Sequence, residues 1–149
     1  MSTGAPDRLG EQELRAWRGL LKVHAAVTRE LDAELLAEHG LSVSTYEVLM
    51  FVADAEDERM RMADLADHVL LSRSGMTRLV DRLVRDGLVE RCAAEDDARG
   101  AYAKLTPAGR TKLDAARRTH LDGVRRIFLR NLRADEQREL GDLWERILG

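Results

Sequence analysis

The residues best suited to chemistry are arginines that recur on one side of a predicted helix over residues 73–86. Because a helix turns by about 100° per residue, the apolar and polar residues of this stretch fall on opposite sides. The apolar side carries Met76, Leu79, Val80 and Leu83, and the polar side carries Ser74, Gly75, Arg78, Arg82 and Arg85. A helix with such an arginine side predicts DNA reading, because major grooves admit one helix and its early residues reach base edges.

Arg78 and Arg82 are the residues that we expect to read bases. Each can make a bidentate contact to guanine O6 and N7, worth roughly 1–3 kcal/mol of discrimination. Gly75 permits close approach, and Arg73, at the helix start, is better placed for a phosphate than for a base. Hydroxyl groups that can bind phosphates or bases are supplied by Ser72, Ser74 and Thr77.

A solvated helix face is the alternative interpretation, in which these arginines pair with Asp81 and Asp86 at helical spacing. The next segment favours DNA. Residues 88–92 and 101–105 alternate as two strands joined by a hairpin. Arg99, at the hairpin end, is positioned to enter a minor groove beside the occupied major groove. Three acidic residues of the hairpin would repel phosphate, and we expect at least Asp97 to fold back onto an arginine.

Helices must position these residues. A long helix is predicted from Glu11 to the stop at Gly40, and a second begins near Ser42 or, two residues later, at Ser44. Residues 62–69 form a two-turn helix, and a tight turn at 70–72, with Ser72 as N-cap, joins it to the arginine helix. This pair is a helix-turn-helix. Residues 59–61 are a connector or a single strand, Thr106 caps a further helix, and a last helix follows residue 135.

Composition limits the classes of protein. The 149 residues fit one domain, or one protomer of an intertwined oligomer, and 4% aromatic residues favour helices over a β-sandwich. Residues 72–91 carry a charge of +2 within a chain of formal net charge −3, so a local patch rather than the whole surface would meet DNA. The chain has no apolar run of transmembrane length and no signal-peptide pattern, which predicts a cytoplasmic protein without a membrane partner.

The chain resembles the MarR family of multiple-antibiotic-resistance-type regulators over about residues 11–148. The segments that carry this resemblance are LSVSTYEVL at 41–49, RMADLA at 61–66, LSRSGMTRLVDRL at 71–83, GLVER at 87–91, DARG at 97–100 and LTPAG at 105–109. The implied fold is mainly α with a small antiparallel β-wing: a winged helix-turn-helix plus a helical dimerisation region. Residues 1–149 would form one such domain. Its expected parts are dimerisation helices at 11–38 and 107–148 and a DNA-binding lobe at 41–106, with the helix-turn-helix at about 62–86 and the wing at about 88–105.

The resemblance implies a homodimer that binds a palindromic operator in double-stranded DNA and represses neighbouring genes. It also implies release by a small aromatic or anionic effector bound between the dimerisation helices and the lobe. The chain departs from the family pattern at Ala98, where the family often has a second wing arginine. It departs again at Arg133-Ala134, where a capping serine and a proline are common.

Four residues are candidates for lining such an effector pocket: Trp17, His24, Tyr46 and His120. His24 and His120 lie on the apolar stripes of their helices and could meet, although a hydrogen-bonded buried histidine is the simpler interpretation. Trp17 and Trp144 are also suited to anchoring a dimer interface.

The lone Cys92 excludes an internal disulfide and leaves open a thiol-responsive regulator, although a small apolar cysteine is the simpler interpretation. The four histidines share no close ligand spacing, so we expect neither a metal nor another cofactor, while a metal-responsive regulator stays an alternative. A protein-interaction scaffold is a further alternative. No nucleophile–base pair, phosphate loop or metal motif points to an enzyme.

Overall fold

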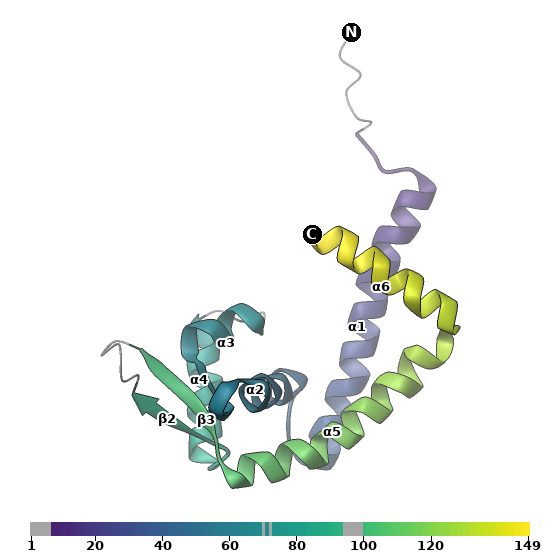
Figure 1. Ribbon diagram of the computed structural model, residues 1–149. Helices are drawn as coiled ribbons and strands as arrows, with labels where there is room; N and C mark the ends of the chain where they lie inside the picture. Colours follow the sequence, from purple (N-terminus) through teal and green to yellow (C-terminus); the bar gives the residue numbers. More distant parts are fainter. Residues whose placement is uncertain (1–6, 70, 72, 94–99) are drawn as a thin grey trace.

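A computed structural model describes residues 7–69, 71, 73–93 and 100–149. This part of the chain is mainly helical with one small antiparallel sheet, which confirms the expected fold class (Figure 1). None of its helices is both long and apolar enough to cross a membrane.

The long first helix, α1 (Glu11–His39), has the predicted ends. At its start the Glu13 carboxylate accepts a hydrogen bond of 2.7 Å from the Gly10 N–H. At its end Gly40 adopts a left-handed φ of 67°, a conformation that glycine enters without steric cost. Two helix signals in the sequence therefore set its length.

Helix α2 (Val43–Asp54) begins at the earlier of the two predicted caps. The Ser42 hydroxyl accepts from the Thr45 N–H at 3.1 Å. A second cap comes from α1, where the Asp32 carboxylate accepts from the Val43 N–H at 2.7 Å. These two bonds fix the first turn of α2 against α1.

The next elements form a winged helix. After the short η1 (Glu56–Glu58) come β1 (Arg59–Arg61), α3 (Met62–His68), α4 (Arg73–Arg85), β2 (Val89–Ala93) and β3 (Ala101–Leu105). The antiparallel sheet has the order β1-β3-β2, so residues 59–61 are a strand rather than a connector. Gly87, with a φ of 73°, follows the end of α4. The predicted Ser72 cap and the folding back of Asp97 fall outside the described residues.

Helix α5 (Pro107–Ile127) starts directly after β3. The Thr106 hydroxyl accepts from the Gly109 N–H at 3.0 Å and donates to the Gly87 carbonyl at 2.6 Å. Gly109 packs so closely on the wing that an added Cβ would lie 2.0 Å from the Leu88 carbonyl oxygen. The chain then passes through η2 (Leu129–Asn131) into α6 (Ala134–Leu148).

The apolar core lies inside the winged helix and reaches only one end of the long helices. Its fully buried members include Tyr46, Leu65, Met76 and Leu83 from the lobe, together with Leu35 of α1 and Leu113 of α5. The first half of α1 extends away from this core and is crossed by α6, which packs only sparsely on the rest of the described chain (Figure 1). Helix α5 joins the two regions.

Candidate nucleic-acid interface

The two sides of α4 have the burial that the sequence predicts. Met76, Leu79, Val80 and Leu83 are at most 4% exposed, and they pack into the core of the lobe. Arg78, Arg82 and Arg85 are exposed on the opposite side, as is Ser74, while Gly75 is half-buried. The side of α4 that carries these arginines therefore faces solvent.

Asp81 does not pair with an arginine of its own helix. Its carboxylate binds the guanidinium of Arg91 on β2 at 2.7 Å. Within the described part of the chain, no ion pair involves Arg78, Arg82, Arg85 or Asp86. The pairing of these arginines with Asp81 and Asp86 along the helix, which the solvated-face alternative assumed, is therefore wrong.

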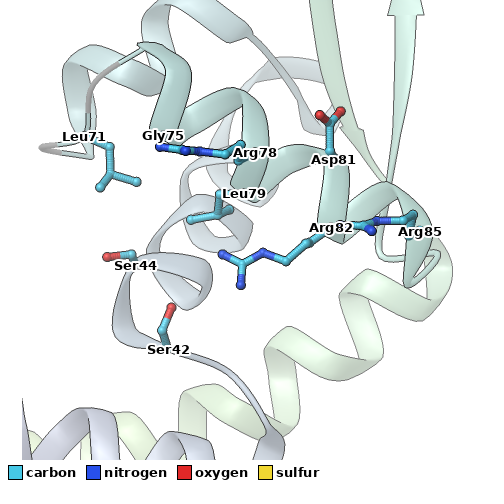
Figure 2. Close-up of a pocket in the computed structure, with 9 residues that line it drawn as sticks. All are labelled: Ser42, Ser44, Leu71, Gly75, Arg78, Leu79, Asp81, Arg82 and Arg85. Carbon is cyan, nitrogen blue, oxygen red and sulfur yellow. The ribbon is translucent and has the colours of Figure 1, made fainter.

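The arginine side of α4 borders a hollow of about 530 Å³. Its residues come from α4, from the turn before it and from the first turn of α2: Ser42, Ser44, Leu71, Gly75, Arg78, Leu79, Asp81, Arg82 and Arg85. Figure 2 shows the guanidinium of Arg82 extending toward Ser42 and Ser44. The arrangement places two hydroxyls opposite a cation, which suits a phosphate or the edge of a base.

Sequence reasoning missed Ser42 and Ser44 as members of this surface. The sequence predicted Ser42 only as a helix cap, and the structure confirms that role. The Ser42 hydroxyl also lies 2.9 Å from the Thr45 hydroxyl. Helical periodicity shows which side of a helix a residue occupies, but it does not show which other helix packs against that side.

The remaining DNA-contact candidates lie at the start of α4 or beyond the described residues. Ser74, Gly75 and Thr77 occupy the first turns of α4, Arg73 begins it, and Ser72 and Arg99 are not among the described residues.

The four effector-pocket candidates do not form one pocket. Tyr46 and His120 meet, with ring centroids 4.4 Å apart and ring planes inclined by 35°. Burial lowers the pKa of His120, and its Nδ1 is buried without a hydrogen-bond partner among the described residues. Trp17 is 54% exposed on the first half of α1, so it lies away from this pair.

His24 belongs to a different place, an apolar groove of about 460 Å³ lined by α1, by Phe128 and Leu132 just after α5, and by α6. An added Cβ at Gly123 of α5 would meet Leu31 of α1, which sets the offset between the two helices. His24 lies seven residues before Leu31, about 10 Å along the helix axis, on the side away from His120. The predicted meeting of His24 and His120 is therefore wrong, because periodicity carries no information on that offset.

Comparison with known proteins decides the family. The sequence model of the MarR family matches residues 39–100. The transcriptional repressor YetL of Bacillus subtilis is 32% identical over 116 residues, which are 74% of this chain and 68% of YetL. The chain belongs to the MarR family. Other curated relatives match over about half of their length.

Solved MarR-family structures share the whole fold. AbsC from Streptomyces coelicolor superposes with a TM-score of 0.90 at 32% identity, covering 96% of both chains. Sco3205 from the same organism, solved in complex with DNA, has a TM-score of 0.90 at 29% identity and covers 96% of this chain and 90% of its own. As a MarR-family member the chain is a DNA-binding transcriptional regulator and not an enzyme.

Proposed function

We infer that the chain is a homodimeric repressor that binds a palindromic operator near its own gene. The observation that carries this proposal is the arginine side of α4, exposed and without an ion-pair partner in the described chain, beside an open hollow. An unpaired guanidinium keeps its full set of donors for DNA. YetL is named a repressor, which supports repression as the direction of regulation.

In this proposal the lobe of residues 41–106 places α4 in a major groove. Arg78 and Arg82 contact guanine edges, and the hydroxyls of Ser42 and Ser44 meet a backbone phosphate beside them. The other residues assigned to DNA are Ser72, Arg73, Ser74, Gly75, Thr77 and, in the wing, Arg99. The single wing arginine contributes the minor-groove contact.

The proposed dimer forms through residues 11–38 and 107–148. The groove between α1 and α6 is lined almost entirely by apolar residues, and three large ones among them, Leu20, Val23 and Trp144, are exposed. Ile147 is 70% exposed and Leu148 is 84% exposed, which is uncommon for a face that stays in water. Two-fold symmetry of such a dimer requires a palindromic operator, with half-sites about one DNA turn apart.

Release by a small aromatic or anionic effector is the regulatory part of the proposal. The lobe meets α5 through the contact of Tyr46 with His120, so a ligand that parts these rings changes the position of α4. An effector that prefers the altered lobe spacing by about 1–3 kcal/mol is sufficient to weaken operator binding.

Fluorescence anisotropy against duplexes tiled across the DNA upstream of the gene tests the proposal, at several salt concentrations. We expect tight binding to one palindromic duplex and loss of that binding in Arg78→Ala/Arg82→Ala. Each lost bidentate contact lowers discrimination by roughly 1–3 kcal/mol.

The control is Arg8→Ala, which removes an exposed arginine outside the lobe and the dimerisation segments that has no ion pair in the described chain. This control should bind as the wild type does. Equal losses in both variants, or equally weak binding of the wild type to every duplex, would contradict operator reading by α4.

A further inference from the structure

The outward face of the three-stranded sheet carries a like-charge pair. Arg59 of β1 lies directly opposite Lys104 of β3 in the antiparallel register. Like charges at directly opposed positions destabilise a sheet. Glu90 of β2 is the partner of Lys104 on the other side, yet no ion pair joins Arg59, Lys104 or Glu90 to any residue of the described chain. Neither cation therefore forms an ion pair within the described chain, although Glu90 lies beside Lys104 and carboxylates line the hollow beside Arg59.

An aromatic ring holds one of these cations in place. The guanidinium carbon of Arg59 lies 4.7 Å from the ring centroid of Tyr102, and that of Arg61 lies 5.2 Å from it. Such cation–π contacts reduce the freedom of a guanidinium without neutralising its charge. Arg59 is thus ordered in advance, as expected for a group that binds an anion.

The connector before β1 is strained. Asp57 and Glu58 have left-handed φ angles of 57° and 51°, a region that non-glycine residues seldom occupy. Glu58 is fixed there by an ion pair with Arg110 of α5. Backbone strain of this kind clusters at functional sites. Here it sets the start of the strand that carries Arg59.

We propose that this outward sheet face, defined by Arg59, Tyr102 and Lys104, binds backbone phosphates of the DNA that flanks the wing. The inference rests on the proposed operator binding. Strand β3 carries both Tyr102 and Lys104 and pairs with β2, the other strand of the wing that the proposed function places against DNA. Successive outward positions along a strand are about 7 Å apart, which lets the face follow a charged backbone.

A polypeptide partner fits this face less well. Protein interfaces have an apolar core, and the large exposed apolar residues of the described chain lie on or beside α1, α4, α5 and α6 rather than on the sheet. The hollow beside Arg59 also contains Glu56, Asp57 and Asp64, which would repel an acidic peptide lying deep in it. The same carboxylates would repel a phosphate deep in the hollow, so the proposed phosphate contact lies on the side of Arg59 that faces the exposed Lys104.

The test compares two duplexes and three forms of the full-length protein. One duplex holds only the operator core identified by tiling, and the other adds about one helical turn of DNA at each end. The proteins are the wild type, Arg59→Gln/Lys104→Gln, and the control Arg8→Gln, at an exposed arginine before α1. Glutamine retains part of each side-chain stem, and thermal melting checks that the folds are equally stable.

The wild type should bind the longer duplex more tightly, with a salt dependence steeper by about 0.9 for each added phosphate contact. Arg59→Gln/Lys104→Gln should lose this gain, about ten-fold in affinity, and keep its affinity for the core duplex. The control should keep both. If the double variant melts early, Lys104→Gln alone, at an exposed position, should remove part of the gain.

Retention of the length-dependent gain in Arg59→Gln/Lys104→Gln overturns the proposal. So does an equal loss on both duplexes, which would indicate a general field effect. A gain that persists, together with poly-glutamate binding that the double variant abolishes, would assign the face to an acidic polypeptide instead. Weak binding of the wild type to the core duplex contradicts the proposed operator function itself, and that measurement involves no sheet variant.

Discussion

Asp81 of α4 and Arg91 of β2 form an ion pair of 2.7 Å that ties the arginine helix to the base of the wing. Asp81 stands three and four residues from Arg78 and Arg85, where it could neutralise either of them. Its engagement with β2 leaves those guanidinium groups available and fixes the wing beside them.

The Asp81–Arg91 pair should add little to stability. Both side chains are more than 40% exposed, and exposed ion pairs contribute about 0.2–1 kcal/mol. A double-mutant cycle with Asp81→Asn and Arg91→Gln, followed by urea unfolding, should give a coupling energy in that range. A coupling well above it would show that the pair is much less solvated than its exposure indicates.

Gly109→Ala should destabilise the protein by about 1–3 kcal/mol, because the new Cβ would overlap the Leu88 carbonyl oxygen. Gly141→Ala is the matched helical control, since a Cβ there meets nothing within 4 Å. It should be stabilising by about 0.5–1 kcal/mol. Thermal unfolding of both variants checks the contrast, and equal effects would contradict the close packing of α5 on the wing.

His120 should make the protein less stable in mild acid. Burial lowers the pKa of His120 from its ordinary value of 6.5. Just below that pH, His120 is therefore protonated in the unfolded chain and neutral in the folded chain. Stability therefore rises with pH through this window and is lost as the pH falls from about 6.5 toward the folded pKa. The contribution is at most about 1.4 kcal/mol per pH unit.

Urea unfolding between pH 7.5 and 5.5 measures this effect in wild type and His120→Phe. The variant should show a shallower pH dependence, while other titrating groups, including Glu47 with its pKa raised mainly by burial, contribute equally to both. Parallel pH profiles for the two proteins would mean that His120 titrates normally in the folded state.

Leu20→Glu should separate the proposed dimer into monomers. Leu20 is 41% exposed and lines the apolar groove between α1 and α6, where a partner would bury a carboxylate. Lys22→Glu also adds an acid to α1 but lies outside the groove lining, and it should stay dimeric. Light scattering after size-exclusion chromatography gives the masses. A monomeric wild type would contradict the dimer directly.

Cys92→Ser should leave operator affinity and its response to peroxide unchanged. Cys92 is half-buried on β2 opposite Tyr102, and the structure offers no second cysteine to pair with it. Anisotropy before and after peroxide treatment is the measurement. Loss of DNA binding in oxidised wild type, but not in the serine variant, would favour the thiol-responsive alternative.

Local signals predicted most of the fold. The stop at Gly40, the cap at Thr106 and the two-sided pattern of α4 each depend on residues within one or two turns, where steric and hydrogen-bonding preferences act directly. The pairing of Arg59 with Lys104 was not predictable, because residues 59–61 are too short for a strand pattern and their partner lies more than 40 residues away.

In the candidate site, too, local features were predictable and contacts between distant segments were not. The side of α4 that faces outward followed from periodicity, but the hydroxyls opposite Arg82 come from α2 and were missed. The four-residue effector pocket failed for a related reason. Tyr46 and His120 meet across two helices, whereas Trp17 and His24 lie beyond the end of the shared core, and helix offsets are set by packing between distant segments.

Helix α5 can move the DNA-binding lobe, because its first turn is joined to the lobe at Gly87, Leu88, Thr106 and Gly109. The hydrogen bond from Thr106 to Gly87 and the close contact of Gly109 with Leu88 attach the end of α4 and the wing rigidly to the start of α5. With 21 residues, α5 is about 32 Å long. A tilt of about 5° at its far end therefore displaces the attached α4 by about 3 Å, half the width of a minor groove.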